Sequence, residues 1–584
     1  MSWPDAVRLA TAEAASGFIT VNSGEPLNVR VKRAQNLTTV IAPLPAPCQN
    51  EHMPAQLWLG DEAVAWGAID AGVGGAFSYA GTPATEIFET VEANAPEIWA
   101  HWSANEKVAY EEALGMSYAG KRALVSMKHV GLNVAADPFM SSALTGVNAG
   151  FVLVVGDDPG MHSSQNEQDS RFFAESAKIP CLEPSSQQEC YDMTREAFRL
   201  SEHFGLPVML RLVTRLAHSR SNVVPAAPDD PPVLPLPDPN DWTLIPANAR
   251  KRNRHLIALQ QHLLDASEHS RFNMLTLAGR RGILCASTAY NYVREAHATS
   301  SDDSILRIGQ YPLPSGLVRQ LVDHCDEIVV MEEGYPFIER HLTGLLGIPG
   351  KAVRGKLDGT LPQDGELLPE MVADVLGVRF PHSVPADSIV AGRPPQFCKG
   401  CPHAYSFNAL IDATSQFEHP LLFSDIGCYA LGMMPPYRAV HACVDMGASI
   451  GMAHGASRAG AHPVVCTIGD STFAHSGMTA MIGAVQTDAN ITILILDNGT
   501  TAMTGTQDSM ATGETLVDIL RGLGVRDLQV IDPLPKTHSE SVVAIRRAIE
   551  HKGLSVVIAR RPCIHVKTKK AAMVLPMVNP QIGQ

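Results

Sequence analysis

The chain has 584 residues, of which 45% are hydrophobic and 18% charged, the composition of a large globular protein rather than of a fibrous or disordered one. This length is too great for one hydrophobic core and predicts roughly four domains. The 45 Lys and Arg residues against 60 Asp and Glu leave a net charge of −15 without a basic stripe, which argues against nucleic acid as a partner.

No stretch of the sequence has the features of a secretory signal or a membrane span. The N-terminus lacks a cationic segment followed by a long apolar core, and no run of about eighteen uncharged apolar residues occurs. The 11 cysteines lack the dense, even spacing of a secreted scaffold, which favours reduced thiols, some of them available as metal ligands. We therefore expect a cytoplasmic protein with no membrane partner.

The first half of the chain predicts an α/β unit behind an N-terminal extension. Residues 1–56 contain Pro43, Pro45, Pro47 and Pro54 and are interpreted as the extension. From 57 to 218, helical segments alternate with apolar strands at 123–127, 150–158 and 206–213. Their apolar residues run continuously rather than alternating, which is typical of parallel strands buried on both faces.

Proline-rich segments separate this unit from two further α/β units. The stretch 219–242 holds seven Pro residues, which predicts a linker at 219–245 without regular structure. A middle unit at 246–380 has strands at 280–288, 303–314 and 326–334. After a second linker at 381–396, the third unit at 397–566 has strands at 462–470, 491–499 and 554–562, and a tail occupies 567–584. The sequence thus predicts a multi-domain α/β fold with parallel sheets flanked by helices.

Two strands of the third unit end in acidic turns. One is followed by Gly469-Asp470 and the other ends in Asp497-Asn498. Ligands of open parallel sheets bind at the carboxyl ends of the strands, so both turns fall where a polar ligand would lie. Asp470, the amide oxygen of Asn498 and a turn carbonyl near Thr500 would fill half of an octahedral Mg²⁺ shell, and a diphosphate could complete it. The alternative is that these are ordinary turn or cap residues.

The spacing of the two turns resembles the thiamine-diphosphate motif. In that motif Gly-Asp-Gly is followed after about two dozen residues by Asn-Asn or a related pair. Here Ser471 replaces the last Gly and Asp497 the first Asn. The residues that the resemblance assigns to cofactor binding are Gly469, Asp470, Ser471, Asn498, Thr500 and Thr504, with Asp470, Asn498 and Thr500 holding Mg²⁺.

Longer segments resemble the 2-oxoacid:ferredoxin oxidoreductases. They are "SYAGTPATEIFE" (78–89) and the run from 102 to 138, while "MKHVGLNVAADP" and "DDPGMHSSQNEQDSR" (157–171) look like the large subunit of the indolepyruvate enzymes. With "CKGCPH" (398–403) and "DIGCYALG" (425–432), the resemblance runs from about residue 57 to 566. It implies a multi-domain thiamine-diphosphate-binding fold whose middle domain is similar to the C-terminal domain of transketolase.

The resemblance assigns catalytic roles to Glu106 and Thr82. Glu106 would share a proton with the aminopyrimidine of the cofactor so that the thiazolium carbon can be deprotonated, a role suited to a carboxyl group shielded from water. Thr82 would contact the cofactor or the substrate carboxylate. Without the resemblance, Glu106 would simply be a favourable charge at a helix N-terminus, and Thr82 an N-cap.

Four cysteines form a candidate metal-ligand set. Cys398 and Cys401 make a CxxC pair, while Cys428 and Cys563 lie far along the chain. Such thiolates suit zinc or an iron–sulfur cluster, and a CxxC pair alone could be redox-active. The resemblance implies a [4Fe-4S] cluster at all four positions. The other cysteines are interpreted as small buried hydrophobes: Cys48, Cys181, Cys190, Cys285, Cys325, Cys443 and Cys466.

The resemblance also implies the reaction and its partners. We expect oxidative decarboxylation of aryl 2-oxoacids such as indolepyruvate, with thiamine diphosphate, Mg²⁺ and the cluster as cofactors and coenzyme A as co-substrate. The 21 residues after Cys563 contain no cysteine, whereas the family usually continues into a ferredoxin-like domain, so electrons are expected to pass to a separate ferredoxin or other acceptor protein. A smaller subunit and a dimer of heterodimers are implied. Two alternatives stay open, a non-oxidative thiamine-dependent decarboxylase or lyase and a non-catalytic scaffold subunit.

Overall fold

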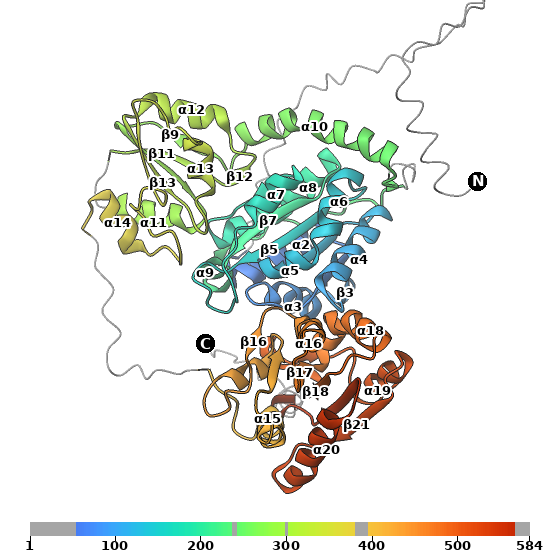
Figure 1. Cartoon of the computed structure of the whole chain (residues 1–584). Helices are drawn as coiled ribbons and strands as arrows, with labels where there is room; N and C mark the ends of the chain where they lie inside the picture. The colour runs from blue at the N-terminus through green and yellow to red at the C-terminus, as the bar shows by residue number, and fades with distance from the viewer. Residues whose placement is uncertain (1–53, 236–241, 298–301, 380–394, 567–584) are drawn as a thin grey trace, which may run out of the picture. The chain divides into compact units, whose positions relative to one another are not determined.

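The computed structural model describes residues 54–235, 242–297, 302–379 and 395–566 (Figure 1). Residues 1–53 of the predicted extension, 381–394 of the second linker, the tail and Cys48 lie outside the described residues. Within the described ranges no helix is long and apolar enough to cross a membrane.

The first sheet has seven strands among the described residues, in the order β12-β6-β7-β5-β4-β2-β3. All neighbours are parallel except β12, which pairs antiparallel with β6. The elements that build this part are β2 (Gly75–Ser78), α3 (Thr85–Asn94), β3 (Trp99–Trp102), α4 (Glu106–Tyr118), β4 (Ala123–Lys128), α5 (His129–Val134), α6 (Ala136–Thr145), β5 (Phe151–Asp157), α7 (Arg171–Ala177), β6 (Cys181–Leu182), α8 (Gln187–Phe204), β7 (Val208–Val213) and α9 (Thr214–His218).

Both faces of this sheet are buried, as the continuous apolar runs predict. Along β5, Leu153 belongs to a core that includes Phe139 of α6, whereas Val154 belongs to a second core that includes Phe198 of α8. Successive side chains of a strand point to opposite faces, so both faces can be covered only if nearly every residue is apolar.

The predicted linker is partly wrong, because its first residues form a strand. β8 (Arg220–Val223) pairs antiparallel with β1 (Gln56–Leu59), which precedes α2 (Gly60–Asp70). The first proline of the stretch is Pro225, so residues 220–223 keep every backbone N–H available for pairing. Gln56, assigned to the extension, is likewise part of β1.

The middle sheet has the order β14-β13-β10-β11-β9 in the described chain, and only β9 runs antiparallel to its neighbour. Its fold matches the expected middle α/β domain. Its elements are α10 (Pro246–Glu268), β9 (Met274–Thr276), β10 (Arg281–Ala286), α11 (Thr288–His297), β11 (Ser304–Ile308), α12 (Ser315–His324), β13 (Glu327–Met331), α13 (Phe337–Thr343), β14 (Ala352–Arg354) and α14 (Pro369–Leu376).

One predicted strand, at 303–314, is two strands in two sheets. β11 belongs to the middle sheet, whereas β12 (Gln310–Tyr311) joins the edge of the first sheet. Between them, the backbone N–H groups of Gly309 and Gln310 donate to the side chain of Asn273 rather than to a neighbouring strand. A Cβ at Gly309 would lie 2.8 Å from the carbonyl oxygen of Phe272, so the chain can turn here only at a glycine.

The third sheet, drawn orange to red in Figure 1, has the order β16-β15-β17-β18-β22-β21 among the described residues, and every pair is parallel. Its central strand β18 sends Ile493 into the core with α16, α18 and α19, and Leu494 into the core with α15 and α20. The elements are α15 (Pro402–Thr414), β15 (Leu421–Ser424), β16 (Ala442–Cys443), α16 (Ala448–Arg458), β17 (Val464–Gly469), α17 (Asp470–Thr472), α18 (Met478–Gln486), β18 (Thr492–Asp497), β19 (Thr500–Thr501), β20 (Gln507–Asp508), α19 (Gly513–Gly522), β21 (Asp527–Ile531), α20 (His538–Glu550) and β22 (Ser555–Arg560).

A fully buried arginine joins the first sheet to the middle one. Arg211 of β7 donates from Nε to Asp157 Oδ2 at 2.6 Å and from a guanidinium nitrogen to the carbonyl oxygen of Glu333 at 3.3 Å, and it also pairs with Glu183. A buried charge is tolerated only when it is paired, so each partner depends on the others.

We expect Arg211→Met to destabilise the protein by about 3–5 kcal/mol, because it leaves the buried Asp157 carboxylate without its paired cation. Thermal unfolding followed by circular dichroism measures the effect. Arg280→Met is the control, since the Arg280–Asp326 pair is exposed, and it should leave the melting temperature unchanged. Equal melting curves for the two variants would contradict the interpretation.

Candidate active site

A cavity of about 780 Å³ collects residues from the first and third sheets. Strands of both sheets end at it, since Tyr79 follows β2, Lys128 ends β4, Asp470 follows β17 and Asn498 follows β18. Carboxyl ends of parallel strands are the usual place for ligands in such sheets, and the volume suits an organic cofactor.

Most of the sequence-predicted site residues line this cavity. They are Thr82, Glu106, Gly469, Asp470, Ser471, Asn498, Thr500, Thr504 and, of the cysteines, Cys428. Segments nearly 400 residues apart in the chain therefore meet in one place.

Glu106 is held by a histidine from the third sheet. Its Oε2 lies 2.8 Å from His475 Nε2, within hydrogen-bond distance, and both side chains are buried. Glu106 is also the first residue of α4, whose N-cap Asn105 accepts a bond from the amide of Val108. The helix-terminus interpretation and a proton-sharing role are therefore compatible.

Space beside the Glu106 carboxylate depends on a glycine. A Cβ added at Gly131 of α5 would lie 2.6 Å from Glu106 Oε1. Real Cβ atoms do not approach this closely, so a side chain here would push the carboxylate away from its position. Asn105 also holds His475, because its Nδ2 donates a hydrogen bond to the carbonyl oxygen of His475 at 2.8 Å.

Ser471, which replaces a motif glycine, makes hydrogen bonds to both sides of the cavity. Its hydroxyl lies 2.9 Å from Tyr79 Oη and 2.8 Å from Thr501 Oγ1. The serine therefore links the first sheet to the turn after β18. Tyr79 also packs edge-on against His475, with ring centroids 4.8 Å apart.

Asp470 has the surroundings of a cation ligand. It is buried in the cavity wall, and its Oδ2 accepts a bond from the amide of Gly499 at 3.1 Å. Burial, with the nearby charge of Asp497, raises the pKa of Asp470 to about 7. A carboxylate destabilised in this way gains from a bound cation, so its chemistry fits Mg²⁺.

The two members of the Asp497-Asn498 pair have different surroundings. Asp497 accepts bonds from Arg560 Nε at 2.9 Å and from the amide of Gly513 at 3.0 Å, and does not line the cavity. Asn498 lines the cavity, and its Oδ1 accepts a bond from the amide of Thr500 at 3.0 Å. Asp497 is therefore structural, and the amide of Asn498 is the group available to a cation.

The remaining threonines of the predicted site are placed as follows. The hydroxyl of Thr500 donates to the carbonyl of Gln507, which leaves the Thr500 carbonyl as the candidate ligand, and that of Thr504 donates to Gln507 Oε1. The interpretation of Thr82 as an N-cap is wrong, because α3 begins at Thr85 and its N-cap is Ala84. Two further residues, Pro83 and Ala84, separate Thr82 from the first residue of the helix.

His403 is a site residue that the sequence did not single out. Its Nε2 accepts from Asn498 Nδ2 at 3.2 Å, and burial lowers its pKa to about 4, so the neutral ring carries its proton on Nδ1. That atom has no hydrogen-bond partner among the described residues, although the ring lines the cavity. An orphaned donor here fits an anionic ligand such as a diphosphate.

A helix terminus also faces the cavity. Gly447 and Ala448 line it and form the N-terminus of α16, an 11-residue helix. Unpaired backbone N–H groups at such a terminus bind phosphates. With Asp470 for a cation and His403 as a donor, the residues present fit a magnesium diphosphate at this end of the cavity and a proton-sharing ring at the Glu106 end.

The sequence analysis did not assign a role to His475, His403, Tyr79 or Lys128. All four lie within or beside motifs named in the sequence analysis, and His475 follows Asp470 by five residues. The short separation of His475 and Asp470 along the chain was the feature of the sequence that could have pointed to His475. It did not show where the side chain points, because that direction is set by β17, α17 and a π-helical turn at Phe473–Gly477.

The four predicted cluster cysteines approach one another beside the cavity. Burial raises the pKa of the Cys428 thiol to about 12, and the thiols of Cys401, Cys563 and Cys398 add to the effect. In the described part of the chain, however, no three of these sulfur atoms lie within 4.8 Å of one another. Ligands of one zinc ion, at about 2.3 Å from the metal, would be roughly 3.8 Å apart. Of the other described cysteines, all are buried except Cys443, which is half-buried.

Two family models match the chain. The C-terminal TPP binding domain of thiamine pyrophosphate enzymes matches residues 425–559, and the thiamine-diphosphate-binding domain of pyruvate flavodoxin/ferredoxin oxidoreductases matches residues 66–241. These regions carry the two walls of the cavity. The class of protein is therefore a thiamine-diphosphate-dependent 2-oxoacid oxidoreductase.

Similar proteins narrow this class. The chain is 39% identical over 543 residues to the indolepyruvate oxidoreductase subunit IorA of Archaeoglobus fulgidus, covering 86% of each chain. It is 36% identical over 563 residues to that of Pyrococcus abyssi, covering 87% of this chain and 85% of the relative. The chain belongs to the IorA family, the large subunits of indolepyruvate oxidoreductases, which confirms the resemblance found in the sequence.

A solved 2-oxoglutarate:ferredoxin oxidoreductase from Magnetococcus marinus is 17% identical with a TM-score of 0.47, covering 55% of this chain and 65% of that one. A likeness this weak has no bearing on the function of the chain.

We expect Gly131→Ala to lower thiamine-diphosphate-dependent turnover of a 2-oxoacid by about 100-fold, because the new Cβ displaces the Glu106 carboxylate. Steady-state kinetics measure the loss. Gly115→Ala, in α4 itself, is the control, since a Cβ there meets nothing within 4 Å. Unchanged turnover in Gly131→Ala would show that the position of the carboxylate is not critical.

Proposed function

We propose that this chain catalyses the oxidative decarboxylation of aryl 2-oxoacids such as indolepyruvate, together with a smaller subunit. The 2-oxoacid and coenzyme A would give the acyl-coenzyme A, carbon dioxide, two electrons and a proton, with the electrons leaving through a [4Fe-4S] cluster to a ferredoxin-type or other acceptor. The observation that carries the proposal is the buried Glu106–His475 pair at the wall of a cavity within a thiamine-diphosphate-binding fold.

Thiamine diphosphate, when bound, supplies a nucleophilic carbon for the 2-keto group and an electron sink for the pair released with carbon dioxide. Glu106 would share a proton with the ring nitrogen of the cofactor, and His475 would hold the carboxyl group in place and exchange that proton. Asp470, Asn498 and the Thr500 carbonyl would hold Mg²⁺. Gly469, Ser471 and Thr504 would shape the pocket around the diphosphate.

Lys128 is the candidate for the substrate carboxylate. It lines the cavity, and its ammonium group donates to the carbonyl and the hydroxyl of Ser163 at 3.0 and 3.1 Å. Burial lowers the pKa of Lys128 to about 8, against the opposing effect of Asp158. Thr82, on the same wall, would make a second polar contact to the carboxylate.

Part of the wall favours a substrate with an apolar side chain. Val130, Val134, Val444, Met446 and Met503 line the same cavity. A planar aryl group gains from burial against such side chains, and methionine adapts to irregular shapes. This lining supports an aryl 2-oxoacid over a small charged one.

Three observations on the cysteines support the cluster. Cys428 lines the cavity, so electrons would travel a short path to its sulfur. The effect of the other three thiols on Cys428 indicates that the four lie near one another, and no three of their sulfur atoms are as close as the ligands of one zinc ion. A non-oxidative decarboxylase would need no such set, and the test below distinguishes the two.

We expect the anaerobically assembled complex to reduce a dye with indolepyruvate and coenzyme A, and Glu106→Gln to lower that rate by about 10²–10⁴-fold, because the proton-sharing group is lost. Glu111→Gln is the control, since Glu111 is exposed on the same helix and pairs only with Lys107 among the contacts described. Iron and sulfide analysis is done on the same preparation. Aldehyde as sole product without dye reduction, or the absence of iron, would overturn the oxidative reaction.

We expect KM for the 2-oxoacid to rise above about pH 8, because Lys128 is charged below its pKa and loses the cation that attracts the carboxylate as the pH increases. In Lys128→Met, KM should be at least tenfold higher at pH 7 and nearly constant from pH 7 to 9. The control is Lys121→Met, an exposed lysine before β4. A wild-type pH profile in Lys128→Met would exclude this role.

A further inference from the structure

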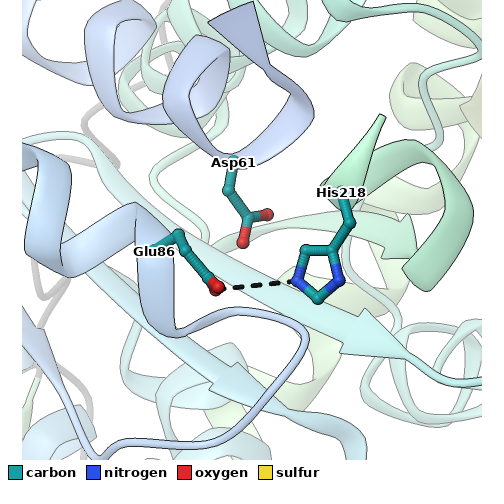
Figure 2. Close-up of side chains that lie close together, drawn as sticks. All are labelled: Asp61, Glu86 and His218. Carbon is teal, nitrogen blue, oxygen red and sulfur yellow. Dashed lines mark ion pairs between the residues drawn. The ribbon is translucent and has the colours of Figure 1, made fainter. Parts of the chain in front are cut away.

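A second cluster of polar side chains lies in the region of the first sheet and consists of Asp61, Glu86 and His218. None of the three lines the cavity described above. Asp61 lies in the first turn of α2, Glu86 in the first turn of α3 and His218 at the end of α9. One ligand atom from each lies within 4.8 Å of the others. Figure 2 shows the carboxylate of Asp61 directed into the space between the other two side chains.

Asp61 is an unpartnered buried carboxylate. Its exposed fraction is 0%, and within the described ranges neither of its oxygens has a hydrogen-bond partner. Burial, followed by the charges of Glu86 and Glu62, raises its pKa well above the usual value. Glu62 itself is engaged elsewhere, since it accepts from the amide of Leu59 and pairs with Arg220. Buried polar groups are almost always satisfied, so this exception requires an explanation.

The other two residues complete a ligand set that opens to solvent. Glu86 Oε2 lies 3.6 Å from His218 Nε2, and the two side chains are 38% and 34% exposed. Glu86 Oε2 itself is buried, like both oxygens of Asp61, and has no hydrogen-bond partner among the described residues.

Close packing keeps the three helix ends together. A Cβ added at Gly60 would lie only 2.2 Å from the carbonyl oxygen of Leu216, so the start of α2 rests directly against α9. This approach sets Asp61 beside His218. The relative positions of Asp61 and His218 are thus set by the packing of α2 against α9.

We propose that Asp61, Glu86 and His218 bind a divalent transition-metal ion. Two carboxylates and one neutral imidazole balance a charge of +2, and mixed oxygen and nitrogen ligands suit zinc and its neighbours better than a hard cation. Such ions hold their ligands at about 2.0–2.1 Å, so ligand atoms are at most roughly 4.2 Å apart, which small side-chain rotations reach from the present positions.

The ion would brace the loop of the candidate active site. α3 follows directly on the Gly81–Ala84 turn that carries Thr82 in the cavity wall. Binding Glu86 to Asp61 and His218 would fix the start of α3 and, with it, this turn. The role is structural and does not depend on which 2-oxoacid the enzyme uses.

The test is zinc titration of the holoenzyme, with thiamine diphosphate and excess Mg²⁺ present so that the magnesium site is filled. Wild type should bind one more equivalent of Zn²⁺ than Asp61→Asn or His218→Gln by calorimetry, and Zn²⁺ should raise the melting temperature of wild type but not of the two variants. If Asp61→Asn does not fold, His218→Gln still tests the proposal. A zinc anomalous peak between the three side chains would locate the ion.

The matched control is Glu92→Gln, because Glu92 is an exposed carboxylate on α3 with no part in the cluster. It should bind zinc as wild type does. Equal zinc stoichiometry in all four proteins, or a peak only at another place, would overturn the proposal and assign Asp61 as a buried carboxylic acid.

Discussion

The hydrogen bond between Glu106 and His475 is the contact on which the candidate site depends. It joins the first turn of a helix on one sheet to a π-helical turn that follows a strand of another, 369 residues away. A carboxylate this deeply buried needs a partner, so the two sheets satisfy one another's polar groups where they meet. The hydrogen bonds of Tyr79 to Ser471 and of Asn105 to the His475 carbonyl reinforce the same contact. The cavity exists because these contacts hold its two walls together.

Four buried carboxylates have two different kinds of surroundings. Asp157, beside Arg211, and Asp497, beside Arg560, each have a guanidinium and a second donor, and they stabilise the fold. Asp470 accepts a bond from the Gly499 amide and has a raised pKa, and Asp61 has no hydrogen-bond partner among the described residues. An incompletely satisfied carboxylate costs folding free energy unless a ligand completes it. This difference separates structural acids from those that we propose to hold cations.

Much of the fold was predictable because its strands are buried on both faces. Continuous apolar runs located β4, β5, β7, β17, β18 and β22, and none of these depends on a distant residue for its identification. The short strands β1 and β8 were missed, since each has only four residues and is defined by its pairing with the other. The division of residues 303–314 between two sheets was also missed. It depends on a distant residue, Asn273, whose side-chain oxygen accepts a hydrogen bond from the backbone N–H of Gly309.

By itself, the sequence determined the order of α/β units, the family, and the polar residues that follow the ends of the central strands, since these are properties of local pattern and of motifs. Only the tertiary structure decided which of them act together. It placed Asn498 in the cavity and turned Asp497 away towards Arg560, and it brought His475 to Glu106. It also left Asp61 unpartnered near His218. The physical reason is that burial and partnership depend on what packs against a residue, and those neighbours come from distant parts of the chain.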